Sequence, residues 1–256
     1  HSTYSDGYLT PTELAKFLAR EGIKVASLTD HNTVSGIAEF RIACRKYGIK
    51  PIIGLELHVK LDYKRLNILW YNFKERDPES HNLLRTSQTR RRGSVRKFLD
   101  KLVVRGFNIN VNKILDKHNH YTPINHVVDD IMATPSNKIR IAKELGSQNP
   151  REEDVITAYF HNRNIGYLKE SYIRIEQIIA LRKKIGGQLI INHPARFQNV
   201  NKELWANIKK LGVDGVEILS PHHSVGSIMR IQNLARELDL ITTGGSDFHR
   251  FEKNNF

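Results

Sequence analysis

Histidines and carboxylates occur in short segments at both ends of this chain. Their spacing is tight, because an Asp and a His are adjacent in one segment and one residue apart in another. Imidazole nitrogens and carboxylate oxygens are the side-chain ligands that divalent transition metals prefer. If these segments meet in the folded protein, they predict a metal-dependent hydrolase. The residues concerned are His1, Asp6, Asp30, His31, Asp247 and His249.

Helix and strand patterns alternate along most of the chain. Thr10-Pro11-Thr12-Glu13 is a capping box with Pro at the first helical position. Helices are predicted at 11–21, 34–47, 172–185, 202–211 and 225–238. Strands are predicted at 25–29, 51–57, 66–71, 188–192, 215–219 and 240–243. The alternation indicates an α/β fold of parallel strands, either a barrel or an open doubly wound sheet.

The predicted strands end beside candidate ligands. Asp30 and His31 follow the strand at 25–29, and His193 follows the strand at 188–192. Glu56 lies near the end of another strand. Functional side chains gather at the carboxyl ends of parallel strands, and no dinucleotide-type glycine loop follows the first strand. The pattern therefore favours a barrel with a metal site, although a lone histidine is more often a surface or hydrogen-bonded residue.

Residues 76–168 interrupt the alternation. They contain a basic run at 85–97, an amphipathic stretch at 95–104 and a polar segment at 108–126. We interpret them as an inserted, basic, mostly helical subdomain with a loop at Arg90–Ser94. The barrel domain would then comprise residues 1–75 and 169–256.

The amino-acid composition limits the classes of protein to which this chain can belong. The chain has 256 residues, a hydrophobic fraction of 39% and no apolar run near the roughly 20 residues that cross a bilayer. One cysteine, Cys44, excludes a disulfide framework and a cysteine-based zinc site within the chain and favours the cytoplasm. The first residue is His and no apolar leader follows it, so we expect the native N-terminus to lie upstream, which leaves targeting open.

The charge balance points to an anionic partner. Lys and Arg outnumber Asp and Glu by 40 to 27, for a net charge of +13. Such a charge favours nucleotides or RNA over a membrane as the partner. The alternative is that the charge forms a solvated basic surface that binds no partner. No protein partner is predicted.

Five motifs, in this order, resemble those of the polymerase and histidinol phosphatase (PHP) family of phosphoesterases. They are Ser5-Asp6-Gly7, Thr29-Asp30-His31, Gly54-Leu55-Glu56, His193-Pro194 and Ser246-Asp247-Phe248-His249. Asn192–Arg196 and Gly244–His249 are most similar to the stand-alone enzymes that act on nucleoside 3',5'-bisphosphates and RNA 5' ends. The resemblance implies a distorted seven-stranded (β/α) barrel, an inserted helical subdomain and two or three divalent ions, Mn, Fe or Zn.

The resemblance also implies a ligand set. One ion would be shared by His1, Glu56 and Asp247, a second by Asp6, His31 and His249, and a third by Glu56, His193 and Asn67. The family's first histidine would fall two residues before His1. Asn67 stands where relatives usually have histidine, and an amide is a poor substitute for imidazole. Either that ion binds weakly, or His58, on the same face of its strand as Glu56, replaces Asn67.

Basic residues and one further histidine are candidates for substrate contacts. Arg196 is close in sequence to His193, and its guanidinium fork suits two phosphate oxygens. Lys138 and Arg140 would grip phosphate, or else lie on a solvated helix face. His223 would contact substrate or protonate the leaving oxygen, or else cap the helix that begins near Ser224.

The leading hypothesis is metal-dependent hydrolysis of a phosphate ester, with Asp247 and His223 as catalytic residues. A metal-bound water would ionise and attack phosphorus in a nucleoside 3',5'-bisphosphate or at the 5' end of short RNA, as a phosphatase or 5'-3' exonuclease. One alternative is a histidinol-phosphate phosphatase, whose cationic substrate suits a basic protein less well. The other is a metal-poor relative that only binds nucleic acid, through Arg85, Arg90–Arg92, Arg96 and Lys97.

Overall fold

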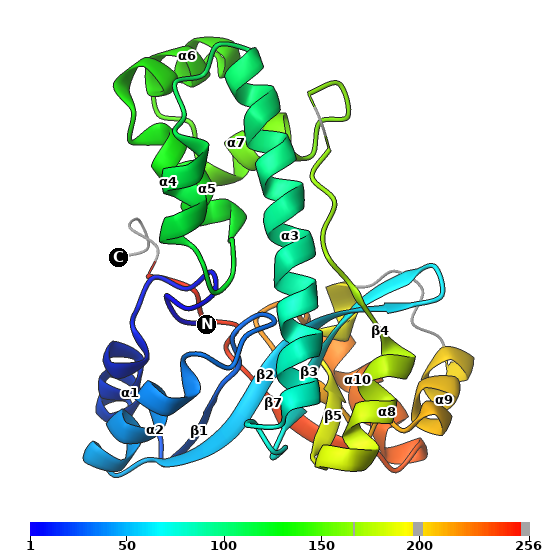
Figure 1. Cartoon of the computed structure of the whole chain (residues 1–256). Helices are drawn as coiled ribbons and strands as arrows, with labels where there is room; N and C mark the ends of the chain where they lie inside the picture. Colours follow the sequence, from blue (N-terminus) through cyan, green and yellow to red (C-terminus); the bar gives the residue numbers. More distant parts are fainter. Residues whose placement is uncertain (166, 197–201, 252–256) are drawn as a thin grey trace. The chain divides into compact units, whose positions relative to one another are not determined.

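The computed structural model describes residues 1–165, 167–196 and 202–251, and it divides into two compact units (Figure 1). Unit 1 comprises His1–Leu84 and Tyr172–Phe256, and unit 2 comprises Arg85–Ser171. The division falls later than the boundary predicted at residue 76. The reason is that helix α3, Pro78–Val104, begins against unit 1, where Leu84 is part of the hydrophobic core.

A seven-stranded sheet forms the frame of unit 1. Its order is β1-β2-β3-β5-β6-β7, and the two-residue β4 pairs with β2. All pairings are parallel except those of β3, which runs antiparallel to β2 and β5. The strands are β1 Val25–Leu28, β2 Lys50–Leu61, β3 Lys64–Tyr71, β4 Ile173–Arg174, β5 Gln188–Ile191, β6 Gly215–Leu219 and β7 Ile241–Gly244.

Two details of the sheet differ from the prediction. The expectation of parallel strands is wrong for β3, because a turn at Asp62 and Tyr63, with Asp62 at φ 50°, folds β3 back on β2 as a hairpin. The segment at 172–174 was predicted as the start of a helix, but Ile173 and Arg174 pair with β2 before α8 begins. The other strands point the same way, so their carboxyl ends share one edge.

Helices flank the sheet of unit 1 and pack against its apolar face (Figure 1). The predicted capping box is confirmed, because the Thr10 hydroxyl accepts from the Glu13 backbone N–H at 3.2 Å and the Glu13 carboxylate accepts from the Thr10 backbone N–H at 2.8 Å. The helices are α1 Pro11–Arg20, α2 Ile37–Lys46, α8 Ile175–Ile185, α9 Lys202–Leu211 and α10 Val225–Glu237. No helix among the described residues is long and apolar enough to span a membrane.

Strand periodicity sorts the side chains of β2 between two faces. Leu55, Leu57 and Val59 point into the main hydrophobic core, and each is at most 2% exposed. Glu56 and His58 alternate with them and therefore face the other side. On β3 the same alternation sends Ile68 to the core and leaves the neighbouring Asn67 on the face of Glu56. The alternation of apolar and polar residues along β2 and β3 thus determines which face of the sheet is polar.

The inner face of the sheet borders a cavity of about 470 Å³. Its lining includes Glu56, Tyr71, Asn192 and Glu217. Strands β1 and β7 are the two ends of the pairing order, and no pairing between them is recorded over the described ranges. The sheet is therefore a curled half-barrel, and closure into a seven-stranded barrel stays a prediction.

Unit 2 is helical and has a core of its own. Arg90–Ser94, predicted as a loop, lies inside α3. Arg91 explains the difference, because its side chain is buried, stacks 4.3 Å from the Tyr121 ring and donates to the Thr122 carbonyl at 2.7 Å. The other elements are α4 Val111–Lys117, α5 Ile124–Met132, α6 Pro135–Leu145, α7 Glu152–Val155 and a π-helical turn at Ile156–Phe160.

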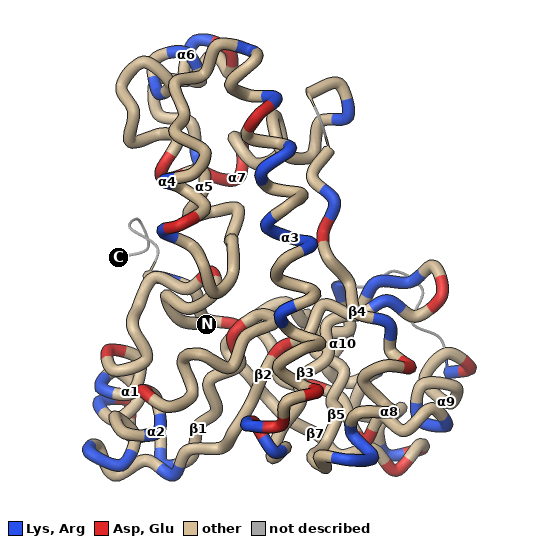
Figure 2. Tube along the Cα trace, in the orientation of Figure 1, with Lys and Arg blue, Asp and Glu red and all other residues tan. Residues whose placement is uncertain are grey.

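The basic run on α3 is partly neutralised within unit 2. Figure 2 shows Lys and Arg distributed along this helix. Arg92 pairs with Asp116 at 2.8 Å, Arg96 donates to the Asn112 side chain at 2.8 Å, and Arg91 pairs with Glu170. These contacts show that part of the run stabilises the helical unit.

Cys44 gives a test of the packing of α1, α2 and β1. Its side chain is fully buried, and burial raises the pKa of the thiol to about 11. At pH 8 only about one thiol in a thousand would be ionised, and the thiolate is the reactive form. We expect no reaction with Ellman's reagent in the native protein and one equivalent in urea. Rapid stoichiometric labelling of the native protein at pH 8 would contradict this packing.

Candidate metal centre

A buried carboxylate holds the loop that carries His1 and Asp6. Asp30, 2% exposed, accepts hydrogen bonds from the Ser2 backbone N–H at 2.6 Å, the Ser2 hydroxyl at 2.6 Å and the Ser5 hydroxyl at 2.7 Å. The sequence placed Asp30 among the candidate ligands, but neither group of possible metal ligands among the described residues includes it. The short hydroxyl residues beside His1 and Asp6 are the signal that could have indicated this clamp.

The pairing of β1 with β2 continues past β1 and sets His31 beside Glu56. The two residues form an isolated parallel bridge. The Glu56 backbone N–H donates to the Asp30 carbonyl at 3.1 Å, and the Asn32 N–H donates to the Glu56 carbonyl at 2.8 Å. Gly54 permits this approach, because a Cβ there would lie 2.0 Å from the Ser27 hydroxyl oxygen. The glycine of the Gly-x-Glu motif therefore has a steric explanation.

The segment after β7 closes over the N-terminal loop. The His1 backbone nitrogen donates to the Phe248 carbonyl at 2.9 Å, and the Tyr8 N–H donates to the His249 carbonyl at 2.8 Å. Asp247 has φ 46°, a left-handed conformation that is uncommon outside glycine. Backbone contacts thus bring Asp247 and His249 to the residues at the start of the chain.

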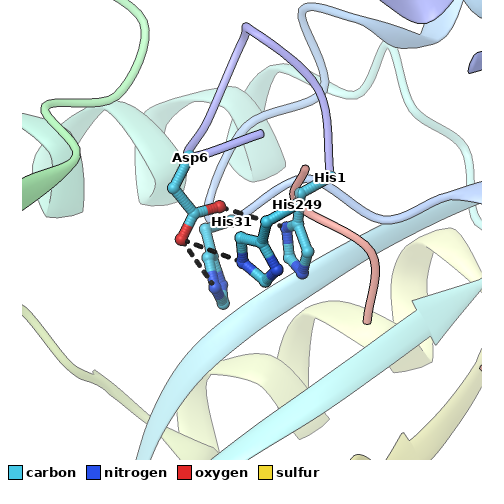
Figure 3. Close-up of side chains that lie close together, drawn as sticks. All are labelled: His1, Asp6, His31 and His249. Atoms are coloured by element: carbon cyan, nitrogen blue, oxygen red, sulfur yellow. Dashed lines mark ion pairs between the residues drawn. The ribbon is translucent and has the colours of Figure 1, made fainter. Parts of the chain in front are cut away.

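The first candidate ligand group is His1, Asp6, His31 and His249, whose ligating atoms all lie within 4.8 Å of one another. Figure 3 shows the three rings around the carboxylate of Asp6. The Asp6 oxygens lie 3.4 Å from His1 Nδ1, 3.5 Å from His31 Nε2 and 3.3 Å from His249 Nε2. The members come from the N-terminal loop, the end of β1 and the segment after β7.

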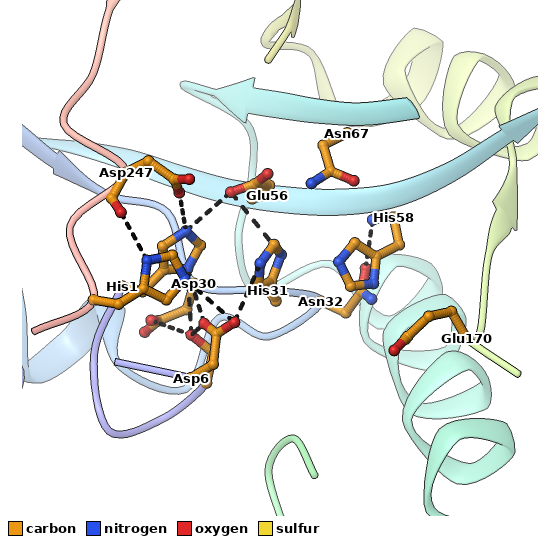
Figure 4. Close-up of polar contacts among 12 residues, drawn as sticks. His1, Asp6, Asp30, His31, Asn32, Glu56, His58, Asn67, Glu170 and Asp247 are labelled. Carbon is orange, nitrogen blue, oxygen red and sulfur yellow. Dashed lines mark hydrogen bonds and ion pairs between the residues drawn. The ribbon is translucent and has the colours of Figure 1, made fainter. Parts of the chain in front are cut away.

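The second candidate group is His1, Glu56 and Asp247 (Figure 4). His1 Nε2 lies 3.1 Å from Glu56 Oε2 and 3.0 Å from Asp247 Oδ1. Nδ1 of His1 therefore faces Asp6 of the first group, and Nε2 faces the carboxylates of the second. The first group contains the residues implied for one ion together with His1, and the second contains those implied for another ion. That these residues bind metal stays a prediction.

The residues implied for a third ion also lie close to one another. His193 Nε2 lies 3.4 Å from Glu56 Oε1 and 3.5 Å from Asn67 Nδ2. Among the described residues, no group of three candidate ligands includes His193. The ring of His58 lies against His31, with the ring centroids 4.4 Å apart. The third set differs from the other two in ligand chemistry, because the amide of Asn67 is a weaker ligand than an imidazole.

Glu217 braces the turn that carries His193. It is 3% exposed on β6, and its Oε2 accepts from the His193 backbone N–H at 3.1 Å. His193 has φ 26°, so this contact holds an unusual backbone conformation. Burial raises the pKa of Glu217 to about 7. Sequence reasoning did not single out this residue, which lies within an apolar strand.

Burial and neighbouring charges act in opposite directions on the histidines. Burial lowers the pKa of His31 to about 3, although Asp6 and Glu56 act to raise it. Burial also opposes protonation of His1, but Asp6, Asp247 and Glu56 outweigh it and raise its pKa well above 6.5. His31 is therefore neutral near pH 7, whereas His1 takes a proton when no other cation is present.

The carboxylates are ionised for the same reason. Burial acts to raise the pKa of Asp247, but the hydrogen bond from His1 prevails and lowers it to about 2. Burial is likewise outweighed at Asp6 and Glu56, whose pKa values lie well below the ordinary ones because of His31 and His1. Closely spaced buried anions need compensating cations. Their chemistry, carboxylate oxygen with imidazole nitrogen, fits divalent ions at both groups.

Arg196 lies beside Asp247, whereas His223 is engaged elsewhere. The half-exposed Arg196 side chain places Nη1 3.8 Å from Asp247 Oδ2. His223 is 9% exposed, its Nδ1 bonds the Ile218 carbonyl at 2.7 Å, and its Nε2 accepts from the Ala195 backbone N–H at 3.4 Å. Both ring nitrogens contact backbone, so the geometry favours a structural histidine near the start of α10 over a catalytic one.

Lys138 and Arg140 belong to α6 in unit 2. Arg140 pairs with Glu144 at 2.6 Å, donates to the Arg105 carbonyl and lies 4.6 Å from the Phe107 ring centroid. These contacts fix its guanidinium within unit 2. Lys138 is exposed on the same helix. Their expected contact with phosphate stays a prediction.

Comparison with known proteins gives three relatives that cover nearly the whole chain. A 5'-3' exoribonuclease from Haemophilus influenzae is 28% identical over 97% of this chain and 88% of its own length. A phosphoribosyl 1,2-cyclic phosphate 1,2-diphosphodiesterase from Eggerthella lenta is 24% identical over 97% and 92%. A 3',5'-nucleoside bisphosphate phosphatase from Chromobacterium violaceum is 24% identical over 97% and 85%. All three names are those of hydrolytic enzymes, an exoribonuclease, a diphosphodiesterase and a phosphatase.

A solved structure shares the fold. A metal-dependent phosphoesterase from Bifidobacterium adolescentis superposes with a TM-score of 0.84 at 21% identity, over 100% of this chain and 88% of that one. Fold, ligand groups and relatives together define a hydrolytic enzyme of the metal-dependent phosphoesterase class. The PHP domain model matches residues 1–188, so the chain belongs to the PHP domain family.

The Asp30 clamp gives a test of how the site is positioned. Asp30→Ala would leave three buried donors without their acceptor, at a cost of about 3 kcal/mol in the free energy of unfolding. We expect urea unfolding of EDTA-treated protein to show this loss. Asp30→Asn keeps one acceptor oxygen and should lose about 1 kcal/mol. An unchanged unfolding midpoint in Asp30→Ala would show that the clamp does not hold the loop.

Proposed function

We propose that this protein hydrolyses a phosphate ester of a nucleotide, either a nucleoside 3',5'-bisphosphate or the 5' end of short RNA. The observation that carries the proposal is the convergence of two ligand groups on His1 at the carboxyl edge of the sheet. The exoribonuclease and the bisphosphate phosphatase among the relatives support this substrate class. The net charge of +13 suits a polyanionic substrate.

Two different sets of residues would bind the divalent cations. His1, Glu56 and Asp247 would hold one divalent ion, and Asp6, His31 and His249 would hold another, Mn, Fe or Zn. When bound, such ions supply positive charge for the phosphoryl oxygens and lower the pKa of water. A third ion near Glu56, His193 and Asn67 is a weaker candidate, because the amide of Asn67 replaces an imidazole. The chemistry of the ligands therefore supports two ions better than three.

Other residues would orient the substrate and the ligands. Arg196 lies half-exposed beside Asp247, where its guanidinium would grip two oxygens of a phosphate. Asp30 fixes the loop of His1 and Asp6, and Glu217 fixes the turn of His193. The neutral ring of His31 keeps a lone pair for an ion at neutral pH. These contacts preorganise the site before substrate arrives.

We also propose the barrel and the inserted subdomain that were predicted from the sequence. The curled sheet would be a distorted seven-stranded barrel, and unit 2 would be an inserted subdomain whose Lys138 and Arg140 contact a longer RNA. A reducing cytoplasm would suit the single buried Cys44. A binding module without turnover is a poorer explanation, because a cluster of buried ionisable groups is costly unless it serves chemistry.

Phosphate release from adenosine 3',5'-bisphosphate in the presence of Mn²⁺ tests the proposal. We expect release by the wild-type protein and a loss of about 100-fold or more in kcat/KM for Asp247→Asn, which removes one ligand charge. A short RNA with a 5' phosphate, assayed in parallel, distinguishes mononucleotide from chain substrates. Arg196→Lys keeps the charge but loses the fork, so its KM should rise more than its kcat falls.

Two outcomes would contradict the proposal. One is turnover that Asp247→Asn leaves unchanged, which would place the chemistry elsewhere. The other is binding of Mn²⁺ by a wild-type protein that releases neither phosphate from adenosine 3',5'-bisphosphate nor mononucleotides from the RNA. Folding of each variant is checked by its thermal unfolding in EDTA, so that a lost site is distinguished from a lost fold.

A further inference from the structure

His222 lies on the outer side of Asp247, in the connection between β6 and α10. Its Nε2 is 2.7 Å from Asp247 Oδ2. The other carboxylate oxygen, Oδ1, lies 3.0 Å from His1 Nε2, in the second ligand group. Asp247 therefore bridges two imidazoles, one inside the candidate centre and one at its rim.

The direction of this hydrogen bond follows from chemistry. An ionised carboxylate has no proton and can only accept, so Nε2 of His222 carries the hydrogen. Arg196 Nη1 lies 3.8 Å from the same oxygen, beyond hydrogen-bond distance. The ring of His222 is in turn held edge-on against His193, with centroids 5.4 Å apart. His222 is therefore both the short partner of Asp247 and a side chain with a defined orientation.

The carboxylate of Asp247 requires a contact that fixes its orientation. It follows β7 through Gly244 and Gly245 and has φ 46°, so no regular secondary structure fixes its side chain. A carboxylate held at one oxygen only can rotate about its Cβ–Cγ bond. A hydrogen bond to Oδ2 removes that freedom and keeps Oδ1 directed at the ligand group. Outer hydrogen bonds of this kind orient metal ligands in proteins.

We propose that His222 is a positioning residue for Asp247, donating its Nε2–H to Oδ2 so that Oδ1 is held ready for a divalent cation. This inference rests on the proposed function, in which Asp247 is a metal ligand. It differs from the expectation for His223, whose ring nitrogens contact backbone. The role requires no change in the charge of His222, because the neutral ring with hydrogen on Nε2 is sufficient.

Direct measurement of Mn²⁺ affinity, by the electron paramagnetic resonance signal of free Mn²⁺, tests this role without turnover. We expect His222→Ala to weaken the tightest Mn²⁺ site by about 10- to 100-fold. His222→Gln, whose side-chain amide can place an N–H near the position of Nε2, should recover most of that loss. The exposed His161 in unit 2 provides the matched control, and His161→Ala should bind Mn²⁺ like wild type.

A second readout separates positioning from direct contact with substrate. If His222 acts through Asp247, saturating Mn²⁺ should restore the KM of His222→Ala for adenosine 3',5'-bisphosphate. The side chain is 32% exposed, so the EDTA-treated variant should unfold at the wild-type temperature. Unchanged Mn²⁺ affinity in His222→Ala, failure of His222→Gln to recover the affinity, or a KM defect that persists at saturating Mn²⁺ would overturn the proposal.

The proposed function fails separately from this inference. Wild-type protein that binds Mn²⁺ but hydrolyses neither adenosine 3',5'-bisphosphate nor the short RNA would contradict the function, while the affinities of the His222 variants would still decide the role of His222. Wild-type protein that binds no Mn²⁺ at all would overturn both.

Discussion

The burial of Glu56 is the constraint on which the rest of the site depends. Its carboxylate is 1% exposed in the middle of the longest strand, and an isolated charge there would be strongly unfavourable. Three partners reach it from two chain segments. His1 approaches from the N-terminal loop at 3.1 Å, Asn192 donates at 2.7 Å from the end of β5, and His193 lies at 3.4 Å in the next position. Burying one carboxylate thus draws separate chain segments to one edge of the sheet.

The same arrangement explains why the site suits cations. Asp6, Glu56 and Asp247 have pKa values lowered by their neighbours, so all three are anionic at neutral pH. Without metal, protonation of His1 and His249, whose pKa values are raised by the nearby carboxylates despite burial, compensates part of that charge. Divalent ions can replace these protons, and lower pH should therefore weaken metal binding by competition. With or without metal, the hydrogen bonds of Asp30 hold the loop that contains His1 and Asp6, and that of Glu217 holds the turn that contains His193.

Much of this organisation was predictable from local sequence signals. Strand periodicity places Glu56 and His58 on the face opposite Leu55 and Leu57, and the capping box fixes the start of α1. The candidate ligands could be named because the short motifs that contain them occur in the order of the resembled family. These are features in which a few neighbouring residues determine the local structure.

Features that depend on tertiary contacts were not predictable in this way. The reversal of β3 depends on a two-residue turn, and the helical state of Arg90–Ser94 depends on the burial of Arg91 among distant residues of unit 2. The adjacent histidines His222 and His223 are indistinguishable by type. Only the geometry directs the first at Asp247 and the second at backbone carbonyl and amide groups. Likewise, Asp30 and Glu217 resemble ordinary acidic residues until their buried partners are known.

Anomalous diffraction from crystals soaked in MnCl₂ would test the central claim most directly. The account predicts one peak within bonding distance of His1, Glu56 and Asp247, and a second within bonding distance of Asp6, His31 and His249. Soaked crystals with no anomalous peak at either group, or with Mn²⁺ bound only at surface carboxylates, would contradict it.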